Sequence, residues 1–220
     1  MTTPPFQRAR RPEHKEQRRQ DILEAAATLA RRDGVRAVTL TDIAAEAGVH
    51  KSAVLRYFES REAVFLLLTA DGWQDWAAAV EGVLREPMGP RETAAALAAT
   101  LAERPLFCDL LAHAPLTLER GVSREQVRDF KVTALGAVDR VARALAVALP
   151  STTRERAVDV IAGTTAMAAQ QWQTANPPET LAALYAEDPL LGHMAAEFTP
   201  RLARLVAMLL AGAARPEEGA

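Results

Sequence analysis

The chain has a single cysteine, Cys108, and this scarcity excludes several kinds of protein. A lone cysteine forms no disulfide within one chain and cannot build a multi-cysteine metal cluster. His113 follows five residues later, a poor spacing for two ligands of one metal on a helix, and no third ligand is near it. The sequence therefore predicts no metal site and fits the reducing cytoplasm.

Long apolar runs are missing as well. The longest, residues 205–214, is rich in small residues and falls well short of the roughly 18 to 20 residues that span a bilayer. The N-terminus carries charge without the apolar segment of a signal peptide. With 49% apolar and 25% charged residues, the 220-residue chain is predicted to be a soluble protein of one or two domains without a membrane partner.

The sequence also lacks the motifs of common enzymes. It has no phosphate-binding glycine loop, no cluster of histidines and acids, and no recognisable nucleophile motif. A reacting set of side chains is a minimum requirement for catalysis. The chain is therefore predicted not to be an enzyme and to need no cofactor.

Charge is present but unevenly divided. Residues 1–62 hold 12 Lys and Arg against 9 Asp and Glu, a net charge of +3, whereas residues 63–220 hold 14 against 19, a net charge of −5. Residues 1–20 alone carry +4, as a solvated tail or as an arm that touches phosphate or a minor groove. The asymmetry predicts two domains with different partners, divided near residue 62.

The whole chain reads as helical, because Ala and Leu dominate, and Pro and Gly fall between the periodic stretches. N-cap patterns mark several starts: Thr39 with Asp42, Ser60, and Ser123 with Gln126. An all-α protein of about nine helices is predicted, with helices near residues 17–33, after Thr39, after Gly48, 61–83, two short ones near Pro105 and Pro115, 124–149, 153–175, and from Thr199 with Pro200 at its first position.

The stretch "LTDIAAEAGVHKSAVLRYF", residues 40–58, fits a helix-turn-helix. Two short helices that cross closely need a small residue at the crossing, a turn residue that tolerates positive φ, and an apolar residue facing inward. Ala44, Gly48 and Val54 meet these needs in order. The second helix would then enter a DNA major groove by its N-terminal end.

The longer stretch from Arg18 to Phe65, "RRQDILEAAATLARRDGVRAVTLTDIAAEAGVHKSAVLRYFESREAVF", resembles the DNA-binding domain of the TetR family of transcriptional regulators. Its specific motifs are "ILEAAATLA", the Gly and Thr before "DIAAEAGV", then "YF" and "SREA". The resemblance implies an all-helical homodimer whose first three helices bind an operator. It also implies a C-terminal domain that binds a small molecule, which releases the DNA.

The family pattern implies DNA contacts at particular positions. Thr39 would meet a phosphate, Lys51 falls on a usual basic position, and Ala53 can contact a thymine methyl. The chain departs from the pattern at His50, commonly Ser, and at Leu55, commonly Tyr. Tyr57 is either a core residue or a DNA contact, and Arg61 either binds phosphate or pairs with nearby carboxylates. The candidate DNA-binding set is Thr39, Thr41, His50, Lys51, Ser52, Ala53, Arg56, Tyr57 and Arg61.

The C-terminal part offers composition without a motif. Large side chains among many alanines, with a few polar groups, are typical of ligand cavities in helical bundles, although plain core packing explains each one as well. The candidate ligand-binding residues are Trp73, Trp76, Phe107, His113, Phe130, Met167, Gln171 and Trp172.

The last two long helices are the candidate dimer interface. Val158, Ile161, Met167, Leu202, Leu205, Leu209 and Leu210 give them apolar stripes, and small residues such as Ala162, Gly163 and Ala166 permit close approach. The sequence as a whole predicts a one-component regulator, most simply a repressor. The alternative is a helical dimeric interaction protein without sequence-specific DNA binding, which leaves the basic N-terminal part unexplained.

Overall fold

The computed structural model describes residues 10–191 and 197–213, and its regular structure there is helical, which confirms the predicted all-α class. Residues 1–9 of the basic N-terminal tail lie outside the described residues, as do residues 192–196 and 214–220. Ten α-helices and one 3-10 turn follow one another within those ranges: α1 (Arg10–Asp33), α2 (Leu40–Glu46), α3 (Lys51–Val54), α4 (Arg61–Val83), α5 (Pro90–Ala102), α6 (Pro105–His113), η2 (Leu118–Arg120), α7 (Arg124–Ala148), α8 (Arg154–Ala175), α9 (Glu179–Glu187) and α10 (Phe198–Ala213).

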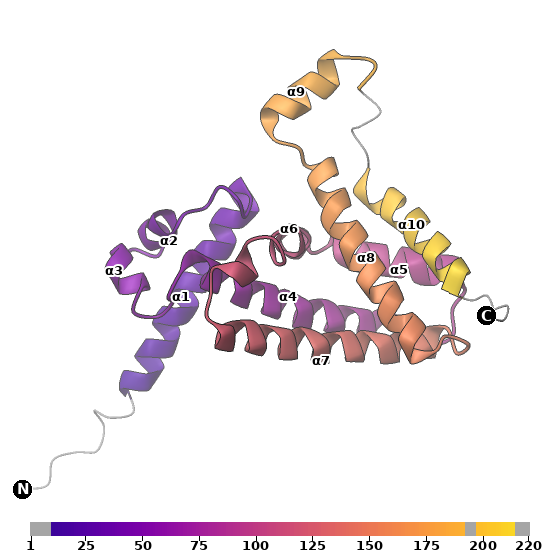
Figure 1. The fold of residues 1–220 in the computed structure, drawn as a ribbon, viewed down its shortest axis with the longest axis horizontal. Coiled ribbons are helices and arrows are strands. Elements are labelled where there is room, and N and C mark those ends of the chain that lie inside the picture. The colour runs from indigo at the N-terminus through magenta and orange to yellow at the C-terminus, as the bar shows by residue number, and fades with distance from the viewer. Residues whose placement is uncertain (1–9, 192–196, 214–220) are drawn as a thin grey trace, which may run out of the picture.

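The first three helices form a small module at one end of the molecule (Figure 1). α1 buries one apolar face in it, which includes Ile22, Ala26 and Leu29. Gly34 ends α1 with φ +82°, and its N–H donates to the Ala30 carbonyl at 2.9 Å. Glycine adopts this left-handed conformation readily, which is why it commonly ends helices.

The remaining helices form the body. α4 and α7 lie side by side, α8 crosses them, and α10 packs against α5 and α8 (Figure 1). α4 belongs to both parts, because its N-terminal turns meet the module and its remainder runs through the body. α4 therefore connects the module to the body.

Aromatic side chains fill the centre of the body. The Trp73 ring meets the rings of Trp76 and Phe107 edge-on, with centroids 5.7 and 5.5 Å away. The Trp76 indole N–H donates to the Thr100 hydroxyl at 3.1 Å, so this buried polar atom is satisfied within the core. Cys108 is also buried here, and burial raises the pKa of its thiol to about 12.

Several element boundaries differ from the sequence expectations. α1 begins at Arg10 rather than near residue 17. α5, which begins at Pro90, was not among the predicted helices, although proline is well accommodated in the first turn of a helix. α10 starts at Phe198, one position before the expected cap. α9 was not predicted, since it lacks a side-chain cap and buries none of its residues. The Ser123 hydroxyl accepts the Gln126 N–H as expected, at 3.3 Å.

No helix among the described residues is long and apolar enough to cross a membrane. Within residues 10–191 and 197–213, no group of three His, Cys, Asp or Glu side chains could hold a metal ion.

Gly72 of α4 lies directly against the Phe107 ring of α6. A Cβ atom at this position would lie 3.0 Å from Cγ of the Phe107 ring and closer still to its Cδ2. Because the ring is held by Trp73 and Trp76, it cannot move aside without disturbing the core. Gly82 lies on the same helix with nothing within 4 Å of such a Cβ.

We therefore expect Gly72→Ala to lower the free energy of unfolding by about 1 to 3 kcal/mol through overpacking. Gly82→Ala should raise it by up to about 1 kcal/mol, since alanine favours helix and meets no obstacle. Urea unfolding followed by circular dichroism measures both. Stabilisation by both substitutions would show that the contact between α4 and α6 is looser than described.

Candidate functional site

The helix-turn-helix is built by local hydrogen bonds. The Thr39 hydroxyl accepts the Asp42 N–H at 3.3 Å, and the Asp42 carboxylate accepts the Thr39 N–H at 2.9 Å and its hydroxyl at 2.6 Å. These bonds complete the predicted capping box, and they hold the pKa of the Asp42 carboxyl below its usual range. The N-terminus of α2 is thereby fixed.

The turn then redirects the chain as the sequence predicts. Gly48 has φ +65°, and the Val49 N–H reaches back to the Ala44 carbonyl at 2.9 Å. Ala44 and Val54 are buried, so the small and apolar positions take their expected places at the crossing. His50 caps α3 without a side-chain hydrogen bond, as its replacement of the usual Ser suggests.

The outer face of this motif carries most of the candidate DNA-binding residues. α3 itself is short, and Val54 anchors it while the neighbouring side chains point outward. Ala53 is half-buried, which is compatible with an apolar contact to a base. Tyr57 is also half-buried, so it is partly core and partly surface. The exposed candidates are Thr39, Thr41, His50, Lys51, Ser52 and Arg56. They lie at the start of α2 (Thr39 and Thr41), at the start of α3 (His50, Lys51 and Ser52) and just after α3 (Arg56).

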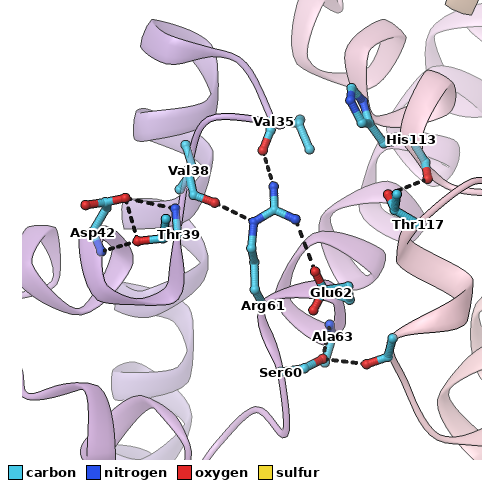
Figure 2. A network of polar contacts seen from close by, with 11 residues as sticks. Val35, Val38, Thr39, Asp42, Ser60, Arg61, Glu62, Ala63, His113 and Thr117 are labelled. Atoms are coloured by element: carbon cyan, nitrogen blue, oxygen red, sulfur yellow. Dashed lines mark hydrogen bonds and ion pairs between the residues drawn. The ribbon is translucent and has the colours of Figure 1, made fainter.

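Arg61 lies elsewhere (Figure 2). Its guanidinium donates to the carbonyl oxygens of Val35 and Val38, contacts Glu62 at 3.3 Å, and lies 4.7 Å from the centroid of the Phe65 ring. Of the two sequence interpretations, the structure favours internal pairing over a phosphate contact. The side chain binds the backbone of the turn between α1 and α2. We therefore exclude Arg61 from the proposed DNA surface.

Asp109, on α6 of the body, also binds the backbone of this turn. Its carboxylate accepts the Val35 N–H at 2.7 Å and the Gln173 amide at 2.8 Å, and the His113 ring lies 3.5 Å away. It is only 8% exposed, so these bonds replace its lost water. Sequence reasoning missed Asp109, although an acid within the apolar run of residues 106–112 signals a buried carboxylate that needs partners.

A second contact joins the module to the start of α7. The Ser60 hydroxyl accepts the Ala63 N–H (Figure 2) and donates to the Gly121 carbonyl at 2.8 Å. The Glu59 carboxylate accepts the Ser123 N–H at 2.6 Å. The first turn of α4 is thus tied to the segment between α6 and α7. Movement of that segment would displace the start of α4, which packs against the module.

Two clefts open at the boundary between module and body. The larger, here the α6–α8 cleft, has a volume of about 850 Å³ and is lined by the turn at residues 30–37, by α6 and by the end of α8. It contains two candidate ligand-binding residues, His113 and Trp172, together with Asp109. The smaller, here the α4–α7 cleft, measures about 270 Å³ and contains Phe130 and Tyr57.

The other ligand-binding candidates fall outside these two clefts. Trp73, Trp76 and Phe107 form the aromatic core, so for them the plain packing interpretation holds. Met167 is half-buried against the core. The Gln171 side-chain oxygen is buried without a hydrogen-bond partner. The eight candidates are therefore distributed over several places instead of one cavity.

Such a motif on a helical body defines a helix-turn-helix transcription regulator, and the comparisons specify which kind. Residues 22–68 match the model for bacterial regulatory proteins of the tetR family, and residues 70–216 match that for the tetracyclin repressor-like C-terminal domain. The second match alone spans more than half of the chain. The protein belongs to the TetR family of transcriptional regulators, whose members are DNA-binding regulators rather than enzymes.

Individual relatives are more distant. The uncharacterized HTH-type transcriptional regulator YfiR of Bacillus subtilis (strain 168) is 38% identical over 60 residues, which are 27% of this chain and 29% of that protein. Thermus thermophilus FadR, a TetR-family repressor solved with lauroyl-CoA, has a TM-score of 0.55 at 20% identity, covering 92% of this chain and 98% of its own. RolR, solved with resorcinol, has a TM-score of 0.54 at 17% identity, covering 94% and 97%.

The arginine beneath the turn generates a stability prediction. Arg61→Met keeps the apolar stem but leaves the buried Val35 and Val38 carbonyls without their partner, so we expect a loss of about 1 to 3 kcal/mol in unfolding free energy. Arg36→Met, at an exposed arginine of the same turn, should change it by less than about 0.5 kcal/mol. Thermal unfolding of the two variants provides the comparison. Equal melting temperatures would contradict the role given to Arg61.

Two exposed basic residues, Lys51 on α3 and Arg56 just after it, generate a prediction for DNA binding. Lys51→Ala should weaken binding to all duplexes and reduce the salt dependence by about one ion, as expected of a phosphate contact. Arg56→Ala should cost about 1 to 3 kcal/mol and relax the preference at one base pair. Fluorescence anisotropy over a salt series separates the two, and Arg85→Ala, an exposed arginine beyond the end of α4, is the control. Full affinity in the Lys51 variant at physiological salt would remove Lys51 from the interface.

Proposed function

We propose that the protein is a cytoplasmic repressor that binds a pseudo-palindromic operator as a homodimer and is released by a small molecule. Residues 1–62 would bind the DNA, and residues 63–220 would dimerise and sense the effector. The observation that carries this proposal is the exposed Lys51 at the N-terminal end of α3, together with exposed Arg56 just after that helix, in a motif whose backbone is fixed. A helix that enters the major groove needs this arrangement.

The proposed dimer uses α8 and α10. Ile161, Leu202 and Leu210 are buried inside their own chain, so this part of the predicted stripe is not available to a partner. The available surface consists of exposed Ala162 and Ala166 on α8, with half-buried Leu205 and Leu209 and the 64% exposed Met208 on α10. Small residues on α8 allow two helices to approach closely. A two-fold pairing here would place two α3 helices for successive major grooves, about 34 to 36 Å apart.

The α6–α8 cleft is the proposed effector site. Its volume lies within the range of about 300 to 1,000 Å³ that small ligands occupy. One wall is the turn that joins α1 to α2, and the opposite walls are α6 and α8 of the body. A molecule bound between them would disturb the bonds from Asp109 to Val35 and Gln173, and so change how the module sits on the body.

The chemical class of the effector does not follow from the relatives. FadR of Thermus thermophilus holds lauroyl-CoA and RolR holds resorcinol, two unlike molecules on the same fold. Whatever its identity, an effector that weakens operator binding must itself bind less tightly to the DNA-bound protein, by the same factor. This reciprocity gives any candidate molecule a quantitative test.

Selection of duplexes from a random pool by the purified protein, repeated over a salt series, tests the proposed function. We expect enrichment of a pseudo-palindrome, with binding by two protomers. Weak binding that is sensitive to salt and enriches no sequence would contradict the regulator proposal, and would favour a helical dimeric interaction protein instead.

A variant of the proposed interface sharpens this experiment. Ala166→Arg places a long charged side chain on the exposed face of α8, so it should leave the chain folded but convert the dimer to a monomer and lower operator affinity at least tenfold. Ala146→Arg makes the same change on the exposed face of α7 and should have no such effect. Sedimentation of both variants reports the oligomeric state. Dimerisation unchanged in the Ala166 variant would overturn the proposed interface.

A further inference from the structure

The charged side chains of the α6–α8 cleft are unevenly placed. The module side, residues 30–37, carries Arg31, Arg32, Asp33 and Arg36, and the body contributes one carboxylate, Asp109. In Figure 1 this end of α1 faces α6, while α3 lies on the opposite side of the module. The arginines of this wall are therefore separate from the proposed DNA-binding residues.

Two of the three arginines on this wall lack a partner of opposite charge. The Arg32 guanidinium donates to both carboxylate oxygens of Asp33, at 2.9 and 2.7 Å, so their charges offset each other. Arg31 and Arg36 are exposed, and neither makes a hydrogen bond or an ion pair with any residue in the ranges 10–191 and 197–213. A guanidinium binds a carboxylate through paired N–H groups, so two such groups on one wall favour an anion.

The buried carboxylate of Asp109 does not attract a cation instead. Its oxygens already accept the Val35 N–H at 2.7 Å and the Gln173 amide at 2.8 Å, and the residue is only 8% exposed. A cationic ligand would have to displace one of these donors, and it would be repelled by Arg31 and Arg36 in the same cleft. The cleft therefore selects against a cation.

The body side of the cleft supplies an apolar surface. Its apolar residues come from α6, from α8 and from the segment after α8: Pro105, Leu106, Trp172, Pro177 and Pro178. The Trp172 ring is half-buried and meets the Phe198 ring edge-on, with centroids 5.5 Å apart, so its position is fixed. Proline has no N–H, so the two successive prolines offer no backbone donor to an anion. A ring or a short hydrocarbon chain can lie against this surface.

We propose that the effector is an organic anion with an apolar body, an inference that rests on the proposed function of this cleft. Arg31 and Arg36 bind its carboxylate from the module, and the surface around Trp172 binds its apolar part from the body. The volume of about 850 Å³ accommodates both ends of such a molecule.

A ligand of this kind contacts both sides of the junction. Its charged end binds the end of α1 and the turn that follows, whereas its apolar end binds α6 and α8. Its affinity therefore depends on how the module is oriented on the body. An operator that fixes this orientation changes the ligand affinity by the same factor by which the ligand changes the operator affinity.

Phenylbutyrate is a suitable probe, because it joins one carboxylate to a phenyl ring, and phenylbutyramide is its neutral counterpart of nearly the same shape. Calorimetry on the full-length protein without DNA should give a dissociation constant in the millimolar range or tighter for phenylbutyrate. The amide should bind about tenfold less tightly, since it lacks the charge-assisted bonds. This preference should shrink as salt is raised, because exposed arginines are screened.

A double variant tests the charged end. Arg31→Met/Arg36→Met removes both cations and keeps their apolar stems, so it should bind phenylbutyrate about tenfold less tightly and the amide unchanged. Arg85→Met/Arg124→Met removes the same net charge at exposed positions outside the cleft, and should change neither affinity. Both double variants should bind a duplex of random sequence equally well. Circular dichroism confirms that each variant is folded.

A single variant tests the apolar end. Trp172→Leu reduces the apolar surface without changing charge, so it should weaken phenylbutyrate and phenylbutyramide by the same factor. Undiminished binding of both probes would place them outside this cleft and contradict the proposal.

Four other results would overturn it: no phenylbutyrate binding by the wild-type protein at millimolar concentration, equal affinities of that protein for acid and amide, undiminished phenylbutyrate binding by Arg31→Met/Arg36→Met, or an equal loss in Arg85→Met/Arg124→Met. Weaker binding of the random duplex by the cleft variant than by its control would instead make these arginines DNA contacts, and would also overturn the proposal.

Ligand binding is measured here without DNA. A pseudo-palindrome can therefore be enriched by a protein that does not prefer the anion, and the anion can be preferred by a protein that selects no sequence. The first result rejects only the class of effector, and the second rejects the proposed repressor function.

Discussion

The peptide groups of the turn between α1 and α2 need hydrogen-bond partners, and the way they are satisfied holds the two parts of the molecule together. The turn lies outside regular secondary structure, so neighbouring side chains must supply the partners that a helix would provide. Arg61 binds the carbonyls of Val35 and Val38 from α4, and Asp109 binds the Val35 N–H from α6. Because Asp109 also binds Gln173 of α8, one buried carboxylate connects the DNA-binding module to two helices of the body.

Both clefts at the boundary between module and body lie close to this junction. The α6–α8 cleft contains Asp109 itself, and the α4–α7 cleft lies beside Tyr57 at the exit of the recognition helix. Each cleft has one wall from the module and another from the body. Both clefts therefore lie where the module meets the body, and the turn between α1 and α2 lines the larger one.

Sequence patterns predicted the local structure well wherever the cause was local. The capping box of Thr39 and Asp42, the positive φ of Gly48 and the burial of Val54 each depend on residues a few positions apart, and all three are confirmed. Errors arose where the cause lay elsewhere. α9 buries no residue and so has no apolar periodicity to detect, and Pro90 begins a helix at a place where proline more often signals a loop.

The sequence by itself determined the all-helical class and the helix-turn-helix, because helix caps, glycine conformation and apolar periodicity are properties of neighbouring residues; the family followed from the resemblance of residues 18–65. The tertiary structure decided what the long side chains do. Arg61 could have faced phosphate or the interior, and only the folded positions of Val35 and Val38 direct it inward. Likewise, Trp76 became core and Phe130 became the wall of a cleft, because the space beside an aromatic ring depends on which distant helices pack against it.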